Sequence, residues 1–333
     1  MSVPRPAQFC GCLIGQCLGD ALGFPVEGGG PDTCRRYVDD VLRAGRAGEK
    51  GRGGFSFGQY TDDSQLAREL LQSYVVCGEF DVEDYARRIA AIFEEQRIVG
   101  RGMATTRAAR RLIRGASWKE SGTPPPSAGN GSAMRAGPVG LICYDDGDHL
   151  VDVAEKQGVI THRDPRCSAG AVAIAGAVSL ALKEKEIVVE EFIGQLSEWM
   201  RPLESSFADF LLTLPQWLSL SPAQAAEPIT PAGKAPGYKD AWRGISPFVI
   251  PSVLWSLYSF LRTPDDYWET ICTAIAVGGD VDTTAAMAGA ISGAWVGLEA
   301  LPHDLARRVS DRGEWGYEAL VELAEKAYEI KMS

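Results

Sequence analysis

The sequence predicts a compact, single-domain, all-α protein. Apolar residues recur at helical spacing along most of the chain, and no convincing run alternates apolar and polar residues as strands do. With 333 residues the chain could hold one large core or two ordinary domains. No linker separates two cores, so we expect one domain over residues 1–333.

Composition limits the classes of partner. The chain has 45% hydrophobic residues, 23% charged residues and a net charge of −11, which argues against nucleic acid or an anionic membrane as a general partner. No stretch approaches the ~18 uninterrupted apolar residues of a membrane helix. Eight scattered cysteines without a C-x-x-C pair, and no signal-peptide pattern, favour a reducing cytoplasm. We expect a cytoplasmic monomer.

The first expected helix spans residues 7–22 and carries glycines four residues apart. Gly11, Gly15 and Gly19 leave one face bare, so another backbone could approach closely. Glu27 follows the end of this helix. A lone glutamate in a loop is most often simply solvated, which leaves its role open at this point.

Residues 28–58 are rich in Gly and Arg and predict a loop, with a short helix over residues 33–42. The next helix opens with Thr61-Asp62-Asp63. Thr61 is a good N-cap, and carboxylates in a first turn are favoured by the helix dipole. Adjacent helical positions point about 100° apart, so the two carboxylates could instead reach two neighbouring cations.

Two amphipathic helices are expected next, over residues 81–96 and 102–114. The second is basic, and its charges are most simply explained as a solvated face. These charges are Arg107, Arg110, Arg111 and Arg114.

A proline-containing loop over residues 121–131 leads into the glycine-rich segment 129–135. A glycine-rich loop that enters a helix presents free backbone N–H groups at the positive end of the helix dipole, which suits a phosphate. The segment matches neither the P-loop nor the dinucleotide fingerprint, so a plain turn is the alternative.

Residues 168–182 are rich in alanine and apolar almost all round, which predicts a central helix. His162, just before it, could contact a ligand or be a structural histidine. Residues 221–244 contain four prolines and predict a loop or an excursion over the surface. Further helices are expected over residues 151–159, 188–200, 206–220, 247–261, 267–277, 302–311 and 315–331.

The segment Asp280-Val281-Asp282-Thr283-Thr284 lies between two runs of small apolar residues. A buried carboxylate is costly unless it is paired or binds a cation. Asp280 and Asp282 cannot pair with each other, and carboxylates, hydroxyls and water are hard ligands suited to Mg²⁺, Mn²⁺ or Ca²⁺. An acidic N-cap, with Asp282 or Thr283 starting the helix at its positive dipole end, is the alternative. Two such helix starts in one chain favour the metal.

In combination, these motifs resemble the ADP-ribosylglycohydrolase family, which includes the dinitrogen-reductase-activating glycohydrolases and the ADP-ribosylarginine and ADP-ribosylserine hydrolases. The resemblance runs in order from about residue 9 to about residue 297. It implies an all-α fold with a two-metal centre that holds two Mg²⁺ or, in some members, Mn²⁺. The matching segments are Gly19-Asp20-Ala21-Leu22-Gly23, Glu27, Thr61-Asp62-Asp63, residues 129–135, Thr161-His162 and Gly279-Asp280-Val281-Asp282-Thr283.

The resemblance also implies roles for single residues. Glu27 matches the acid that handles the water or the ribose, and Asp62 and Asp280 are the other candidate bases. The implied metal ligands are Thr61, Asp62, Asp63, Asp280, Asp282 and Thr283. The implied substrate-binding residues of the loop that holds the diphosphate and distal ribose are Gly129, Asn130, Gly131, Ser132, Met134 and Arg135. His162 matches a residue near the substrate.

The activity implied is metal-dependent hydrolysis of the N- or O-glycosidic bond that links ADP-ribose to a modified protein side chain. The expected partners are an ADP-ribosylated protein and ADP-ribose, without nucleic acid or membrane. A two-metal phosphoester hydrolase, which would release AMP, is one alternative. An inactive binding or structural member of the family, as among lens crystallins, is another. None of the matched acidic positions is substituted, which speaks against the latter.

Overall fold

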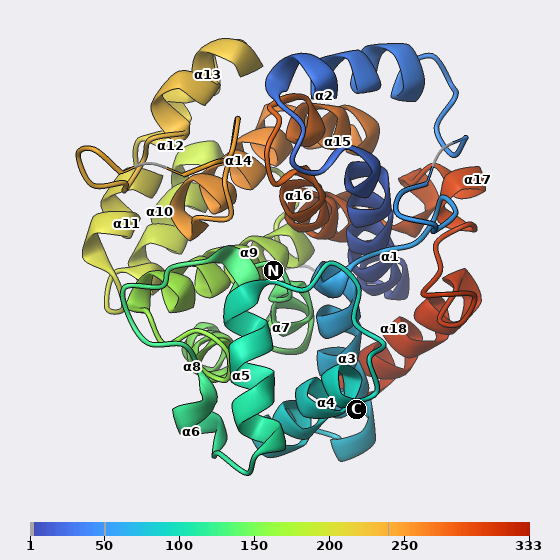
Figure 1. Cartoon of the computed structure of the whole chain (residues 1–333), viewed down its shortest axis with the longest axis vertical. Helices are drawn as coiled ribbons and strands as arrows, with labels where there is room; N and C mark the ends of the chain where they lie inside the picture. The colour runs from blue at the N-terminus through green and yellow to red at the C-terminus, as the bar shows by residue number, and fades with distance from the viewer. Residues whose placement is uncertain (1–2, 50, 239) are drawn as a thin grey trace.

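The computed structural model describes residues 3–49, 51–238 and 240–333 (Figure 1). Helices joined by loops make up these residues, and the strand-like pairings among them are isolated bridges without a sheet. The all-α prediction is therefore confirmed. Figure 1 shows α1 and α16 side by side near the centre of the molecule, with the remaining helices arranged around them.

Most helices lie close to the expected ranges. In the first half they are α1 (Pro6–Gly23), α2 (Pro31–Tyr37), α3 (Asp62–Cys77), α4 (Val82–Glu94), α5 (Met103–Ile113), α6 (Trp118–Ser121), α7 (Gly137–Ile142) and α8 (Gly147–Val159). In the second half they are α9 (Pro165–Lys183), α10 (Val189–Met200), α11 (Ser205–Leu211), α12 (Leu214–Trp217), α13 (Pro222–Ile229), α14 (Val249–Arg262), α15 (Tyr267–Ala276), α16 (Val281–Val296), α17 (His303–Ala306) and α18 (Tyr317–Met332). The short segments are η1 (Phe24–Val26), η2 (Val38–Leu42), η3 (Asn130–Ser132) and η4 (Leu298–Ala300).

In the second half of the chain two expected helices are shorter than predicted, and the expected loop or excursion contains a helix. The helix expected over residues 206–220 is divided into α11 and α12, because Pro215 occupies the first turn of a new helix. The loop expected over residues 221–244 contains α13, in which Pro222 likewise opens the helix. The helix expected over residues 302–311 is only the single turn of α17.

The glycine face of α1 packs directly on the backbone of α16. A Cβ atom at Gly15 would lie 2.4 Å from the carbonyl oxygen of Gly289, and one at Gly19 would lie 2.2 Å from that of Ala285. Only glycine allows this approach at these positions. The two helices are antiparallel, so the contact brings the end of α1 beside the start of α16.

The core explains the strongly apolar helices. Residues Pro6–Val26 and Pro165–Lys183 are long and apolar enough to cross a membrane by length and composition, but 89% of each apolar window is buried inside the fold. Helix α9 is covered by α7, α8, α10, α14 and α16. All eight cysteines are free, and all but Cys77 are buried.

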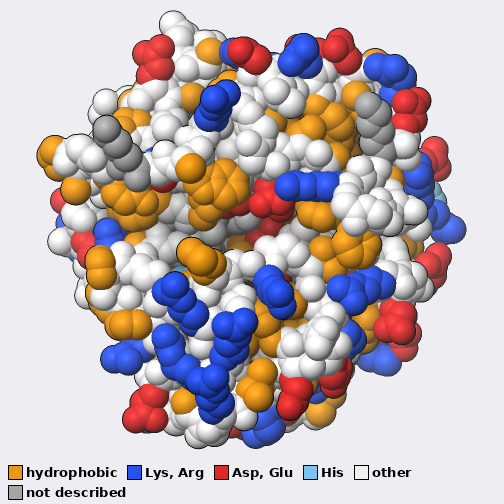
Figure 2. Space-filling model, in the orientation of Figure 1, with side chains coloured by type: hydrophobic (Ala, Val, Ile, Leu, Met, Phe, Trp, Pro, Cys, Tyr) orange, Lys and Arg blue, Asp and Glu red, His pale blue; other side chains and the backbone are white. Residues whose placement is uncertain are grey.

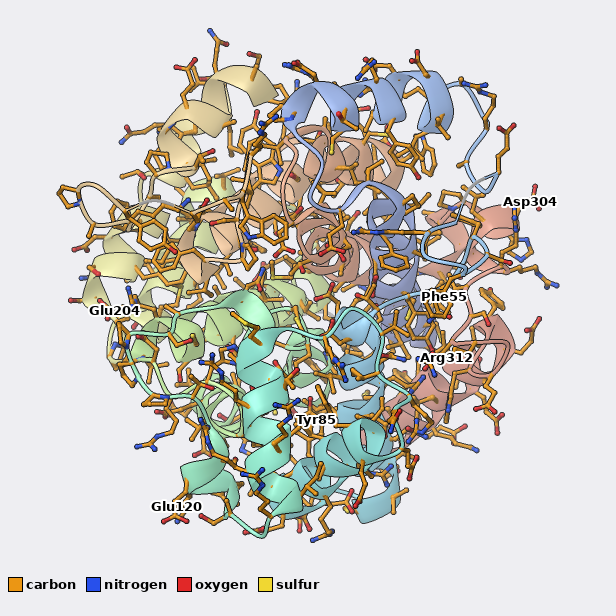
Figure 3. All side chains as sticks on the ribbon, viewed as in Figure 1. Phe55, Tyr85, Glu120, Glu204, Asp304 and Arg312 are labelled. Atoms are coloured by element: carbon orange, nitrogen blue, oxygen red, sulfur yellow. The ribbon has the colours of Figure 1, made fainter. Side chains whose placement is uncertain are left out.

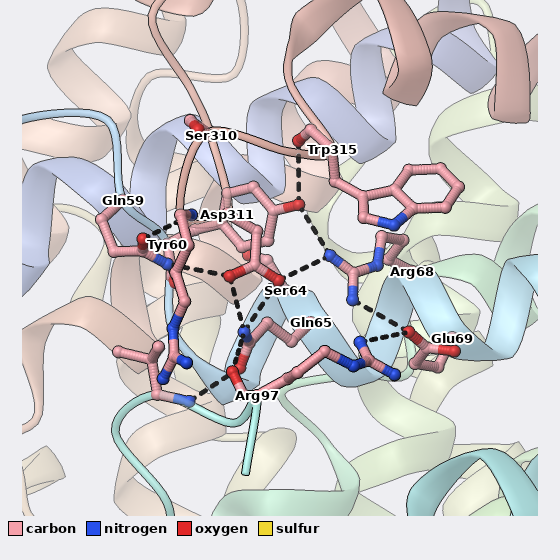
Figure 4. A network of polar contacts seen from close by, with 12 residues as sticks. Gln59, Tyr60, Ser64, Gln65, Arg68, Glu69, Arg97, Ser310, Asp311 and Trp315 are labelled. Carbon is pink, nitrogen blue, oxygen red and sulfur yellow. Dashed lines mark hydrogen bonds and ion pairs between the residues drawn. The ribbon is translucent and has the colours of Figure 1, made fainter. Parts of the chain in front are cut away.

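A buried polar network ties α3 to the segment before α18 (Figure 4). The fully buried Arg68 donates to Asp311 Oδ2 at 2.8 Å, and Gln65 Nε2 donates to both oxygens of the same carboxylate at 2.8 and 2.9 Å. Gln65 Oε1 accepts from the Val99 N–H at 2.9 Å, and the Val99 carbonyl accepts from the Asp62 N–H at 2.7 Å. The network therefore holds the first turn of α3 in place.

Candidate active site

The first turn of α3 is capped twice. Thr61 Oγ1 accepts from the Asp63 N–H at 3.4 Å, as its N-cap position predicts. Asp20, from α1, accepts from the Thr61 N–H at 2.9 and 3.0 Å, from the Ser64 N–H at 3.2 Å and from the Ser64 hydroxyl at 2.7 Å. No role was predicted for Asp20, although it is an acid within an otherwise apolar, glycine-rich helix and lies in the segment Gly19-Asp20-Ala21-Leu22-Gly23 that resembles the family.

The first turn of α16 is arranged differently. Asp280 occupies the N-cap position, but its side chain makes no capping bond. Instead its Oδ2 accepts from Asn130 Nδ2 at 2.6 Å, and Asn130 Nδ2 also donates to Ser252 Oγ at 2.9 Å. Asp282 Oδ1 accepts from the adjacent Thr283 N–H at 2.9 Å. The N-cap position thus falls on Asp280 and not on Asp282 or Thr283, as the alternative expected, and the Asp280 side chain makes no capping bond there.

Two groups of carboxylates meet where α1, α3 and α16 converge. Asp20, Asp63 and Asp282 each offer an oxygen, and these atoms all lie within 4.8 Å of one another. Glu27, Asp280 and Asp282 form a second group within the same limit. Because Asp282 belongs to both groups, the geometry allows two cation positions bridged by one carboxylate.

The predicted hydroxyl ligands lie on the same cluster. Thr283 Oγ1 donates to both oxygens of Asp63 at 3.2 Å, and Thr61 Oγ1 donates to Asp63 Oδ2 at 3.1 Å. Asp62 is buried nearby but stands outside both carboxylate groups, and its Oδ2 accepts from the Gly102 N–H at 3.4 Å. Metal ligation by these residues stays a prediction.

The cluster is electrostatically unbalanced. The five aspartates at the site are buried, and among the described residues no ion pair links any of them to a lysine or arginine; they are Asp20, Asp62, Asp63, Asp280 and Asp282. Burial raises the pKa of Asp20 and of Asp280 to about 7. Burial, with repulsion from neighbouring carboxylates, raises the pKa values of Asp62, Asp63 and Asp282 well above the usual range of an aspartate. Oxygen donors carrying this uncompensated charge fit divalent cations such as Mg²⁺ or Mn²⁺.

Glu27 lies at the rim of the cluster and is partly exposed. Arg52, from the loop over residues 28–58, donates through Nη1 to Glu27 Oε2 and to the Phe24 carbonyl, both at 2.8 Å. Its guanidinium also lies 5.2 Å from the centre of the Phe24 ring. This segment therefore contributes a contact to the predicted base.

The glycine-rich segment 129–135 is joined to the acids by Asn130, whose side chain donates to Asp280 Oδ2. Among the described residues, the N–H groups of Gly131 and Ser132 take part in no backbone hydrogen bond. His162 packs against this turn, because a Cβ atom at Gly131 would lie 2.6 Å from the His162 Cε1 atom. Burial lowers the pKa of His162 to about 3, so its ring is neutral. The side chains of Ser132 and Met134 are buried.

Arg135 stabilises the glycine-rich segment through hydrogen bonds. Its buried guanidinium donates to the Gly131 carbonyl at 3.0 Å, to the Gln157 carbonyl at 2.7 Å and to Thr161 Oγ1 at 2.8 Å, while Nε donates to Gln157 Oε1 at 2.8 Å. These contacts shape the turn around Gly131. A direct contact between Arg135 and a substrate stays a prediction.

Comparison with known proteins identifies the family. The family described as ADP-ribosylglycohydrolase matches residues 1–332. The chain belongs to the ADP-ribosylglycohydrolase family. Among similar proteins, ADP-ribosylhydrolase ARH3 of Gallus gallus is 31% identical over 90% of this chain and 88% of its own. ADP-ribosylarginine hydrolase Tri1 of Serratia proteamaculans is 25% identical over 88% of this chain and 72% of its own.

A solved structure shows that the fold is shared. The structure is described as an ADP-ribosylglycohydrolase-related protein complex, and it superposes with a TM-score of 0.71 at 24% identity over 99% of both chains. The resemblance and the single-domain ADP-ribosylglycohydrolase fold are therefore confirmed. In this ADP-ribosylglycohydrolase, the roles of individual site residues are inferred from the geometry.

Proposed function

We propose that this ADP-ribosylglycohydrolase cleaves the N- or O-glycosidic bond that links ADP-ribose to a modified protein side chain. The observation that carries the proposal is the pair of carboxylate groups that share Asp282, the second of which includes Glu27. Asn130, hydrogen-bonded to Asp280, joins this cluster to the turn that presents the free N–H groups of Gly131 and Ser132. Family membership and the names of ARH3 and Tri1 support ADP-ribosyl hydrolysis in general.

The donor set fits two divalent cations, Mg²⁺ or Mn²⁺. Such ions, when bound, hold ribose hydroxyls and lower the pKa of a bound water. Asp20 is a candidate ligand in addition to those implied by the family resemblance. The proposed ligands from that resemblance are Thr61, Asp62, Asp63, Asp280, Asp282 and Thr283.

The chain's own groups have separate tasks. A glycosidic bond to ribose breaks at the anomeric carbon through a state with oxocarbenium character, which nearby carboxylates stabilise. Glu27, at the rim, is the proposed base that accepts a proton from the attacking water, and Asp62 and Asp280 are the alternatives. Asn130 fixes one oxygen of Asp280 through its 2.6 Å hydrogen bond.

Product analysis tests the proposal. Purified protein is incubated with arginine-linked and serine-linked ADP-ribosyl peptides, with Mg²⁺, with Mn²⁺ or with a chelator. Free ADP-ribose that depends on metal supports the proposal, AMP indicates a phosphoester hydrolase, and the absence of any product indicates an inactive member.

Two variants complete the assay. Asp282→Asn removes the carboxylate shared by both groups and is expected to abolish release of ADP-ribose. Asp304→Asn is the matched control, because Asp304 is exposed at the outer edge of the molecule (Figure 3). Retained release of ADP-ribose by Asp282→Asn would contradict the proposed site.

A further inference from the structure

Positive charge is concentrated beside the acidic cluster. Residues 97–119 contain seven arginines and lysines and neither aspartate nor glutamate, in a chain whose net charge is −11. Figure 2 shows Lys and Arg side chains gathered over α5 and α6, below the acidic side chains visible near the centre of this face. On this face, positive charge on α5 is therefore separated from the acids.

Three of these charges form a line along the exposed face of α5. Arg107, Arg110 and Arg114, which we call the basic stripe, are three and four residues apart and therefore share one helix face. All three are exposed, and among the described residues none of them has an ion pair. Exposed arginines elsewhere are commonly paired, as Arg201 is with Asp209 at 2.8 Å.

Helix α5, which carries the basic stripe, starts beside the site. The Gly102 N–H, just before α5, donates to Asp62 Oδ2 at 3.4 Å. In the first turn, Thr105 Oγ1 lies 3.3 Å from the position of a Cβ atom at Gly131. From there α5 extends about 16 Å outward at 1.5 Å per residue. Glu120, labelled in Figure 3 at the far end, is the first acidic residue after the stripe.

We propose that the basic stripe docks an acidic segment of the protein that carries the ADP-ribosyl group. The inference rests on the proposed function, because a bond held in the site places neighbouring residues of the modified protein near the start of α5. Unpaired arginines offer charge and hydrogen bonds that aspartate and glutamate side chains complement. The stripe would then select among modified proteins by local sequence.

A protein segment fits this surface better than a nucleic acid does. The exposed apolar side chains on α5 are Met103 and Ile113, which suit contacts with polypeptide, and neither can stack a base. The stripe covers only the length of one short helix, whereas a longer chain of phosphates would extend over a protein of net charge −11.

Binding without catalysis is the first test. A fluorescein-labelled peptide of glutamate and glycine is titrated with wild type and with the triple variant Arg107→Glu/Arg110→Glu/Arg114→Glu, and fluorescence anisotropy is measured. We expect the triple variant to weaken binding by about tenfold or more, and added salt to weaken wild-type binding. The control Lys185→Glu/Arg201→Glu/Lys326→Glu changes the net charge equally at exposed sites outside α5 and should bind nearly as wild type does.

Three outcomes would overturn the proposal. They are a failure of wild type to bind the acidic peptide, an equal loss of affinity in both triple variants, and tighter binding of single-stranded DNA than of the peptide. The neutral triple variant Arg107→Gln/Arg110→Gln/Arg114→Gln guards against misfolding, because it should also lose affinity while its circular dichroism and melting temperature match wild type.

Kinetics link the surface to substrate choice. With ADP-ribosyl peptides flanked by aspartates or by asparagines, wild type should show a lower KM for the acidic peptide, and the charge-reversed triple variant should lose this preference while keeping kcat. An unchanged preference in the variant overturns the proposal. If wild type cleaves neither peptide, the proposed function fails, and the anisotropy measurement still decides whether the stripe binds acidic segments.

Discussion

At the scale of single residues, Asp20 shows how this chain holds a buried carboxylate with neutral donors. The Thr61 and Ser64 N–H groups and the Ser64 hydroxyl supply its hydrogen bonds, and no cation is paired with it among the described residues. The same carboxylate offers an oxygen to Asp63 and Asp282 in the first acidic group. One side chain thus orients α3 and contributes to the candidate metal site.

Replacement of Asp20 by asparagine tests this double role. The amide is nearly isosteric, but its NH₂ group would face a donor of Thr61 or Ser64. We expect a loss of about 1–3 kcal/mol in the free energy of unfolding, measured by urea denaturation at pH 8, and weaker Mg²⁺ binding by calorimetry. Asp304→Asn is the control. A denaturation midpoint equal to that of wild type would show that Asp20 does not support α3.

Replacement of Glu27 should lower the turnover rate strongly while it changes the stability of the fold only slightly. We expect Glu27→Gln to lower kcat by ~10²–10⁴-fold, as the loss of a general base does, while it changes the free energy of unfolding by less than about 1 kcal/mol. Steady-state kinetics and urea denaturation measure the two quantities. The stability change should be small because the contact with Arg52 is partly exposed.

Arg52→Gln is the matched control for Glu27. It removes the same ion pair and leaves the glutamate in place, so it should retain most of the turnover. If Glu27→Gln keeps turnover within about threefold of wild type, the base is Asp62 or Asp280, or no protein base is required. If both variants lose turnover equally, the ion pair and not the base is what matters.

At the scale of helices, the packing of α1 on α16 was partly visible in the sequence. The glycines at positions 11, 15 and 19 predicted a bare face, and the structure shows a backbone against it. The partner could not be predicted, because small residues also recur in residues 168–182 of α9. The hydrogen bond by which Arg135 supports the Gly131 turn could not be predicted either, because local sequence does not distinguish a buried structural arginine from one that binds a ligand.

A single methyl group on this glycine face should therefore disturb both fold and site. In Gly15→Ala the new Cβ atom would lie 2.4 Å from the Gly289 carbonyl oxygen, so α1 and α16 must separate. We expect a loss of more than about 2 kcal/mol in the free energy of unfolding, together with weaker metal binding. Thermal and urea denaturation measure the stability.

Gly194→Ala is the matched control for Gly15→Ala. Gly194 lies within α10, and a Cβ atom there meets nothing within 4 Å. Alanine has the higher helix propensity, so this variant should gain about 0.5–1 kcal/mol. Equal effects of the two substitutions on the free energy of unfolding would show that the close contact between α1 and α16 does not stabilise the fold.

At the scale of the whole molecule, the site exists only because distant segments meet. The sequence predicted both acidic helix starts and Glu27, which the structure brings together, whereas Asp20 was visible only as part of a segment that matches the family, without a predicted role. The Arg52 contact was equally hidden, because residues 28–58 lack periodicity and a loop's path is set by the surface it covers. Local pattern predicts helices and caps, whereas the site depends on long-range packing.

The cluster should make the stability of the whole protein depend on pH and metal together. Asp20 and Asp280 have pKa values near 7 in the folded protein, above the usual value of an aspartate, so the folded state binds their protons more tightly than the unfolded state does. Their contribution to stability is therefore present at low pH and lost as the pH rises through about 7. Aspartates with lowered pKa values, such as Asp164, are already ionised above about pH 5.5 and do not oppose this change there.

In a chelating buffer we accordingly expect the melting temperature to fall between about pH 5.5 and pH 8. Mg²⁺ or Mn²⁺ competes with protons for the same carboxylates, so the rise in melting temperature that it causes should grow over the same range. Differential scanning fluorimetry with and without metal measures both slopes. The variant Asp282→Asn, which lacks the carboxylate shared by both groups, should show a shallower fall and a smaller metal effect. A metal effect that is the same at every pH would mean that the ions bind somewhere other than this buried cluster.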